Sequence, residues 1–187
     1  MILAVIFSSC ISTPDYTPPD YEANLQQYLD AVNKNKLASD LAVIDDSLYT
    51  QWHYNDVQID TKGGVRYRIL SLGTGEKPVL ASSILFKYKG ILFSKLQLQD
   101  GVFKGEAFDE NQTPGANDYS PVARLIIGMQ TTLPLLPEGT VVQMFIPSGL
   151  GYGPDGMPNR NTGDYVIPKD ANLYFEMTLV DVYTPVQ

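Results

Sequence analysis

The stretch Val141-Val-Gln-Met-Phe-Ile-Pro-Ser-Gly-Leu-Gly-Tyr-Gly153 joins a predicted strand to a glycine-rich loop. In residues 141–146 the even-numbered and odd-numbered side chains face opposite sides of a sheet. Pro147 ends this strand because it has no N–H to give to the ladder. Three glycines then allow tight turns and leave Leu150 and Tyr152 as the large side chains of the loop. A phenol on such a loop offers an apolar face and a hydroxyl donor, which suits recognition of a peptide.

Alternation with a period of two residues recurs in three other segments. It covers residues 65–69, residues 82–92 and residues 173–183, the last with a continuous apolar face. A further short strand is expected at Val102 and Phe103. The second half of the chain is therefore expected to be rich in strands.

One helix is expected between residues 125 and 139, and it contains Pro134. Proline is accepted in the first turn of a helix and breaks a helix further in. The regular part is therefore expected to begin near Thr131 or Thr132. Strands, one short helix and two more strands predict an α+β domain over residues 65–187, with a twisted antiparallel sheet on a helix.

An N-terminal helical arm is expected over residues 21–55, with Asp20 as its cap. Helices this short are not stable alone, so they must pack on the main domain, on each other or on a second copy of the chain. Residues 56–64 end in Lys62-Gly-Gly64, a turn signal, and are interpreted as a linker. The apolar residues at helical spacing are Tyr21, Leu25, Tyr28, Leu29 and Val32, then Leu37, Leu41, Ile44, Leu48 and Trp52.

Residues 1–10 form an apolar run with small residues before Cys10, which resembles the lipobox of a bacterial lipoprotein. Residues 11–20 are rich in Pro and Thr and are expected to form an extended tether. We expect Cys10 to carry a lipid that anchors the protein in the bacterial cell envelope, at the outer membrane and facing the periplasm. The alternative is an unmodified bystander thiol.

Composition and motifs exclude several classes of function. The net charge of −8 and the pI near 4.5 give no electrostatic footprint for nucleic acid. One cysteine and one histidine cannot build the usual zinc site or an internal disulfide. Gly151–Gly156 matches a dinucleotide-binding pattern, but Pro154 and Pro158 prevent the helix that must receive the phosphates. We expect no metal, no cofactor and no hydrolytic chemistry.

Six motifs follow one another along residues 65–183. They are Phe86-Lys-Tyr-Lys-Gly90, Phe108-Asp109, Leu125-Ile-Ile-Gly128, Leu136-Pro-Glu-Gly139, Ile146-Pro-Ser-Gly-Leu-Gly-Tyr-Gly153, and Val166-Ile-Pro168 with Ala171-Asn-Leu-Tyr-Phe175. In this order they resemble the FKBP-type peptidyl-prolyl isomerases. The resemblance implies a bent antiparallel sheet around one short helix, with an apolar pocket that takes a proline ring and needs no cofactor.

The resemblance also implies roles for individual residues. Tyr152 would donate its hydroxyl to a substrate carbonyl, the N–H of Ile126 would be a second donor, and Asp109 would orient pocket groups. Met129 stands where the family usually has a tryptophan floor, and the segment 121–125 is shorter than usual, so that Val122 is the candidate for the next pocket residue. The expected catalytic residues are Tyr88, Phe108, Asp109, Ile126, Tyr152 and Phe175, and the expected substrate-binding residues are Val122, Met129, Val166 and Ile167.

The resemblance implies a peptidyl-prolyl cis-trans isomerase that assists the folding of exported envelope proteins. Rotation about an X–Pro bond faces a barrier of roughly 20 kcal/mol, and a site lowers it by preferring the twisted amide. An alternative, favoured by Met129 and the shortened segment, is a peptide-binding chaperone or adaptor with weak or no catalysis. Another is a structural envelope protein that self-associates through the helical arm.

Overall fold

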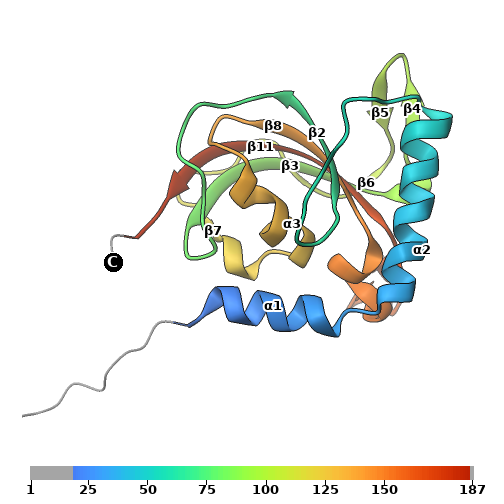
Figure 1. The fold of residues 1–187 in the computed structure, drawn as a ribbon, viewed down its shortest axis with the longest axis horizontal. Coiled ribbons are helices and arrows are strands. Elements are labelled where there is room, and N and C mark those ends of the chain that lie inside the picture. The colour runs from blue at the N-terminus through green and yellow to red at the C-terminus, as the bar shows by residue number, and fades with distance from the viewer. Residues whose placement is uncertain (1–18, 186–187) are drawn as a thin grey trace, which may run out of the picture.

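The computed structural model describes residues 19–185, and its centre is a bent antiparallel sheet wrapped around the short helix α3 (Ile127–Thr132) (Figure 1). The strand order is β1-β2-β8-β11-β3-β6, and β7 also pairs with β3. This arrangement confirms the predicted α+β class. The strands of this sheet are β1 (Gln58–Ile59), β2 (Arg66–Ser71), β3 (Ser83–Leu92), β6 (Ala107–Asn111), β7 (Ser120–Pro121), β8 (Val141–Ile146) and β11 (Leu173–Tyr183).

Two small hairpin-like sheets and several helical segments surround the main sheet. β4 (Gln97–Gln99) pairs with β5 (Val102–Lys104), and β9 (Met157–Pro158) pairs with β10 (Tyr165–Ile167). The arm consists of α1 (Tyr21–Ala31) and α2 (Lys34–Asp45), which continues as a π-helical turn, Asp46–Gln51. Short 3₁₀ turns occupy Phe93–Lys95, Val122–Arg124, Leu133–Leu135, Ser148–Leu150 and Gly153–Asp155.

The pair β8 and β11 separates two hydrophobic cores. Met144 and Phe175 lie opposite each other in the register and belong to the core that contains α3. Phe145 and Tyr174 are also paired, and they belong to a second core on the other face of the sheet. Because both faces are covered, β8 is buried along nearly its whole length. The alternation predicted for residues 141–146 thus corresponds to two buried faces.

The predicted start of the central helix near Thr131 is wrong, because α3 begins at Ile127 and ends at Thr132. Pro134 follows α3 and lies within the 3₁₀ turn Leu133–Leu135. A proline ring clashes only with a helix that continues through it, so a helix can also end just before the proline. Because the helix begins at Ile127, Met129 lies in its middle, and its side chain is buried.

The arm packs on the main domain, which was the first of the three arrangements left open by the sequence. In α1, Leu25 and Leu29 join the α3 core, whereas Ile44 and Leu48 join the second core against Phe145 and Tyr174. Figure 1 shows α1 running beneath α3, and α2 standing beside the β4–β5 hairpin. The arm therefore covers two sides of the sheet.

The segment interpreted as a linker, residues 56–64, contributes to the sheet. β1 pairs with β2, and the buried Asp60 carboxylate accepts hydrogen bonds from the N–H groups of Lys62 (2.9 Å) and Gly63 (2.8 Å). The turn signal at Lys62-Gly-Gly64 thus corresponds to a turn that leads into β2. Residues 56–64 are therefore part of the folded domain and do not form a separate linker.

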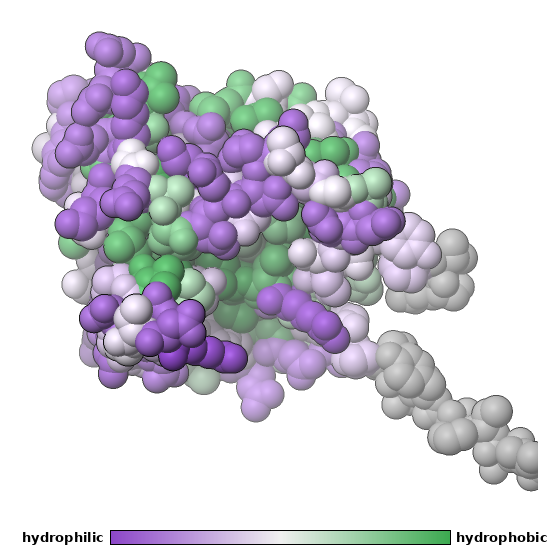
Figure 2. Space-filling view, turned by 180° about the vertical axis from the view of Figure 1, so that it is seen from behind, coloured by the Kyte–Doolittle hydropathy of each residue, from purple (hydrophilic) through white to green (hydrophobic). Residues whose placement is uncertain are grey.

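Apolar side chains gather in a hollow on one face of the molecule (Figure 2). Seen from behind, they collect in the middle of the face, and hydrophilic side chains border them above and below (Figure 2). Across residues 19–185, no helix combines the length and the apolar character needed to cross a bilayer. Cys10, the expected site of lipid attachment, lies outside the described residues.

Candidate active site

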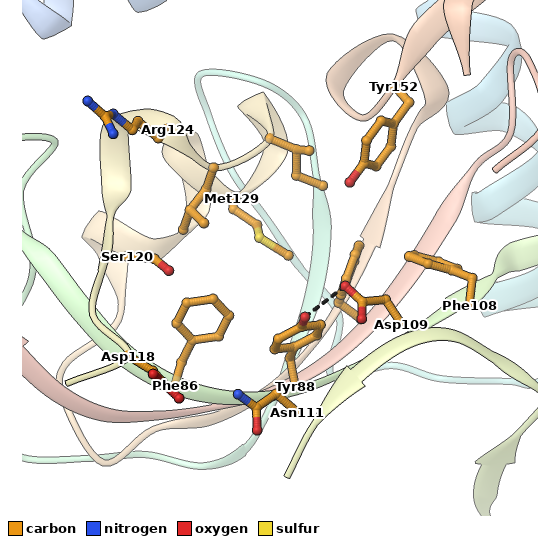
Figure 3. Close-up of a pocket in the computed structure, with 13 residues that line it drawn as sticks. Phe86, Tyr88, Phe108, Asp109, Asn111, Asp118, Ser120, Arg124, Met129 and Tyr152 are labelled. Carbon is orange, nitrogen blue, oxygen red and sulfur yellow. Dashed lines mark hydrogen bonds between the residues drawn. The ribbon is translucent and has the colours of Figure 1, made fainter. Parts of the chain in front are cut away.

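A cavity of about 350 Å³ lies between α3, the strands β3, β6 and β11, and the loop after β8 (Figure 3). Aromatic rings form much of its wall, and several polar side chains stand around it. Its lining residues are Phe86, Tyr88, Phe108, Asp109, Asn111, Asp118, Ser120, Arg124, Leu125, Ile126, Met129, Tyr152 and Phe175.

Gly90 makes room for two of the aromatic rings. It lies opposite Phe175 on one side and opposite Asp109 on the other in the register of β3 with its neighbours. A Cβ at this position would lie 2.6 Å from Phe108 Cζ and 2.7 Å from Phe175 Cε1. The rings of Phe108 and Phe175 therefore meet above the glycine, edge to face, with centroids 5.6 Å apart and planes at 87°. This geometry is a favourable one for an aromatic pair.

Tyr88 and Asp109 form the hydrogen bond that links β3 to β6 inside the cavity. The Tyr88 hydroxyl donates to Asp109 Oδ2 over 2.7 Å. Burial, and secondarily the hydrogen bond to Asp109 and its negative charge, together raise the pKa of Tyr88 to about 12. The phenol is therefore protonated at neutral pH, and one oxygen of Asp109 is occupied by it. Asp109 accordingly orients a pocket ring.

Tyr152 enters the cavity from the loop after β8, with its hydroxyl pointing inward (Figure 3). The 3₁₀ turn Ser148–Leu150 precedes it, and Leu150 is fully buried, which fixes the loop on the core. Burial, and secondarily the charge of Asp109, raises the pKa of Tyr152 above the usual tyrosine value. Among residues 19–185 its hydroxyl has no hydrogen-bond acceptor, so it is a protonated donor available to a ligand.

A second available donor stands at the start of α3. Ile126 lines the cavity and precedes the first residue of the helix, and its carbonyl accepts from the N–H groups of Met129 and Gln130. Within the described chain, the N–H of Ile126 donates to no protein group. It can therefore donate to a carbonyl of a bound molecule. Met129, buried on α3, also lines the cavity.

Three of the four expected substrate-binding residues do not line this cavity. Val122 is fully buried in the α3 core, because the 3₁₀ turn Val122–Arg124 directs it inward and leaves Arg124 to line the cavity. Ile167 is also fully buried in that core. Its neighbour Val166 lines a different cavity of about 460 Å³, which shares Phe108 with the first.

Several lining residues were missed by sequence reasoning. Phe86 lies two residues before Tyr88 on β3, so the period-two pattern that predicted the strand could have placed both rings on one face. Asn111 lies opposite Tyr88 in the register of β3 with β6, a pairing that no local pattern predicts. Asp118, Ser120, Arg124 and Leu125 also line the cavity, and they come from the segment between β6 and α3.

The arrangement suits binding of a small apolar ring joined to polar groups. Rings and a thioether surround the interior, while a phenol and a backbone N–H offer donors at its edge. In the part of the chain that the structure describes, no three His, Cys, Asp or Glu side chains cluster as metal ligands would. The site can act by desolvating a bound group and by donating hydrogen bonds to it.

Comparisons with known proteins agree with this geometry. The family model for FKBP-type peptidyl-prolyl cis-trans isomerases matches residues 75–180. The chain is 29% identical over 119 residues to outer membrane protein MIP of Legionella longbeachae, a match that covers 64% of this chain and 44% of that protein. It is 28% identical over 119 residues to the FKBP-type peptidyl-prolyl cis-trans isomerase FkpA of Escherichia coli K12, covering 64% of this chain and 38% of FkpA. The chain thus spans less than half the length of these relatives.

Solved structures share the fold at low identity. A peptidyl-prolyl cis-trans isomerase from Pseudomonas syringae superposes with a TM-score of 0.57 at 23% identity, covering 90% of this chain and 99% of that chain. FkpA from Escherichia coli superposes with a TM-score of 0.59 at 23% identity, covering 87% of this chain and 64% of that chain. Both matches extend beyond residues 75–180 in coverage, which places part of the arm within the shared architecture.

Proposed function

Because the chain belongs to the FKBP-type peptidyl-prolyl cis-trans isomerase family, we propose that its cavity binds X–Pro segments of peptides and accelerates their cis–trans isomerisation. The observation that carries this proposal is the combination of an aromatic cavity with two donors that have no partner in the described chain. The donors are the Tyr152 hydroxyl and the N–H of Ile126.

The mechanism requires no covalent step. The barrier of roughly 20 kcal/mol arises from amide resonance, and a twisted amide has lost that resonance. An apolar cavity desolvates the bond, and donors that hold the flanking carbonyls favour the twisted form over either planar form. The proline ring would rest on Met129 between the rings of Tyr88 and Phe175. Asp109 would act through its hydrogen bond with Tyr88 and transfer no proton.

A second candidate function is peptide binding with little turnover, and Met129 is the observation that favours it. A thioether at the floor is flexible and lacks a ring face. A floor of this kind fixes a proline ring less firmly, so that binding could persist while preference for the twisted amide falls. Retention of the two donors favours catalysis.

We also propose a cellular setting. The Legionella relative is named an outer membrane protein, which supports placement of this chain in a bacterial envelope. A lipid on Cys10 would anchor it there, and exported proteins with exposed prolines would be its substrates. Membrane fractionation of the wild type and of Cys10→Ala tests the anchor, because the variant should move to the soluble fraction.

Self-association through the arm is a separate proposal. The apolar residues Leu25, Leu29, Ile44 and Leu48 are buried within the chain, so a dimer contact would use exposed arm residues such as Val43 and Tyr49. Sedimentation analysis of the wild type and of Val43→Asp tests this. A monomeric wild type would remove the proposal.

Titration of an X–Pro peptide into the ¹⁵N-labelled full chain separates binding from catalysis. The amide signal of Ile126 should shift on binding, and exchange cross-peaks between cis and trans peptide should grow in proportion to the protein. A shift of the Ile126 signal without growth of the cross-peaks would support the peptide-binding alternative.

A further inference from the structure

A buried carboxylate from the arm holds the loop that carries Tyr152. Asp40 lies on α2 with 4% of its surface exposed, and Ser148 begins the 3₁₀ turn after β8 and is fully buried. Asp40 Oδ2 accepts from the Ser148 hydroxyl (2.5 Å) and from the Ser148 N–H (3.1 Å). The two residues are separated by 108 positions in the sequence. A carboxylate this buried is stabilised by several donors, and Ser148 supplies two of them.

Further contacts fix the same loop from the same side. Lys36 pairs with Asp40 Oδ1, and its ammonium group also donates to the Ser148 hydroxyl oxygen over 3.2 Å. The Tyr28 hydroxyl donates to the Gly149 carbonyl over 2.9 Å. A Cβ at Gly149 would lie 3.0 Å from Val32 Cγ2, so the glycine permits the loop to approach the end of α1 closely.

The loop leaves this anchor and reaches the cavity within four residues. Ser148 forms the anchor, Leu150 is buried in the α3 core, and Tyr152 lines the cavity. Over so short a distance, a displacement of Ser148 is transmitted to Tyr152, and a shift on the order of 1 Å in a positioned group can cost a large part of a rate.

From these contacts we infer that Asp40 is a positioning residue for the Tyr152 hydroxyl, so that one contact of the helical arm, Asp40 with Ser148, supports the isomerase site. Asp40 itself does not line the cavity, because no residue of the arm is among the lining residues. The inference rests on the proposed function for its kinetic consequence. Its structural consequence, the placement of Tyr152, is independent of turnover.

A double-mutant cycle tests the inference in the full chain. Tyr152→Phe, Asp40→Ala and the double variant are compared by their rates of X–Pro exchange. Loss of one hydrogen bond to the substrate predicts a fall of roughly two- to tenfold for Tyr152→Phe. The exchange rate of Asp40→Ala should fall by no more than this, and the double variant should be no slower than Tyr152→Phe. Asp40→Asn, which keeps one acceptor oxygen, should recover part of the rate.

The matched control is Asp45→Ala. Asp45 lies on the same helix and pairs with Arg66 of β2 over 2.6 Å, so its loss weakens an arm contact that does not involve the Tyr152 loop. The control should retain the wild-type rate. If Asp40 had a merely structural role, Asp45→Ala would lower the exchange rate as much as Asp40→Ala does, or Asp40→Ala would lower the rate as much in the Tyr152→Phe background as in the wild type. Either result overturns the inference.

A spectroscopic measurement separates failure of the inference from failure of the proposed function. In protein labelled with 3-fluorotyrosine, Tyr152→Phe assigns the ¹⁹F signal of residue 152. That signal should move in Asp40→Ala and stay in place in Asp45→Ala. If the wild type shows no turnover but the signal moves, the proposed function fails and the positioning role stands. An unmoved signal in folded Asp40→Ala overturns the positioning role.

Discussion

Tyr88 on β3 and Asp109 on β6 are joined by a hydrogen bond of 2.7 Å across two neighbouring strands of the sheet. The bond orients the Tyr88 ring within the cavity and occupies one oxygen of the carboxylate whose charge acts on Tyr152. A role for Asp109 in orienting the Tyr88 ring uses this hydrogen bond as the structure shows it.

The burial of Tyr88 and its hydrogen bond to Asp109 predict a loss of stability in alkaline solution. The pKa of Tyr88 is about 12 in the folded protein and about 10 in an unfolded chain. Between these values the unfolded state loses the Tyr88 proton first, so the free energy of unfolding falls as pH rises from about 10 to 12. Tyr88→Phe should make this fall less steep. Urea titrations at pH 9 and pH 11.5 measure it, with the exposed Tyr183→Phe as the matched control, and equal slopes for all three proteins would contradict the prediction.

Gly90→Ala should disrupt the aromatic wall. The new methyl group would overlap Phe108 and Phe175, both at less than 3.0 Å. Displacing two rings from a packed site costs typically 1–3 kcal/mol of stability. We expect the isomerisation rate to fall more than stability alone explains, because the same rings line the cavity. A folded variant with the wild-type rate would show that the wall tolerates displacement.

Met129 can be tested as the floor through two substitutions. Met129→Leu nearly conserves volume and should cost less than about 1.5 kcal/mol, whereas Met129→Ala leaves a cavity beneath the site and should cost about 2–5 kcal/mol. Peptide affinity should follow the same order, since a proline ring loses its contact surface in the alanine variant. Denaturant unfolding and peptide titration measure the two quantities. Equal affinity in the alanine variant would show that the ring rests elsewhere.

The arm should contribute to the stability of the whole chain. Ile44 is fully buried against the outer face of the sheet, while the adjacent Val43 is 53% exposed. Ile44→Ala should lower the free energy of unfolding by about 2–5 kcal/mol, whereas Val43→Ala should change it by less than about 0.5 kcal/mol. Similar effects for the two variants would mean that the arm is not packed on the sheet as described. A fragment that begins at Gly64 would lack the arm and would therefore expose Phe145 and Tyr174, which pack against Ile44 and Leu48. Activity is for this reason best measured on the full chain.

Strands with a clear period-two pattern of apolar residues were predictable from the sequence, whereas pairings between distant segments were not. The segments 82–92, 141–146 and 173–183 each carry apolar side chains at alternate positions over at least one buried face, and all three are strands. The strands β1, β6, β9 and β10 are short and are defined by their partners, so they escaped prediction. The helix boundary was wrong because Pro134 is compatible with either a start or an end of a helix, and only packing decides which.

The candidate site shows the same division. Tyr88, Phe108, Ile126, Tyr152 and Phe175 came from motifs whose order resembles the family, and the structure brings them together around one cavity. Val122 was assigned from the shortened segment 121–125 and Ile167 from the motif Val166-Ile-Pro168, but the turn that contains Val122 and the strand β10 that contains Ile167 place both side chains in the core. Asp40 carried no sequence signal for a role at the site. Its contact with Ser148 exists only because the arm folds back on the sheet.

The most direct test of the account is exchange spectroscopy of a short X–Pro peptide with the purified full chain and with Tyr152→Phe. We expect the wild type to accelerate cis–trans exchange and the variant to be slower by roughly two- to tenfold, as for loss of one hydrogen bond, while its melting temperature changes little. No acceleration by the folded wild type, or an equal rate in the variant, would contradict the claim that this cavity and its tyrosine catalyse prolyl isomerisation.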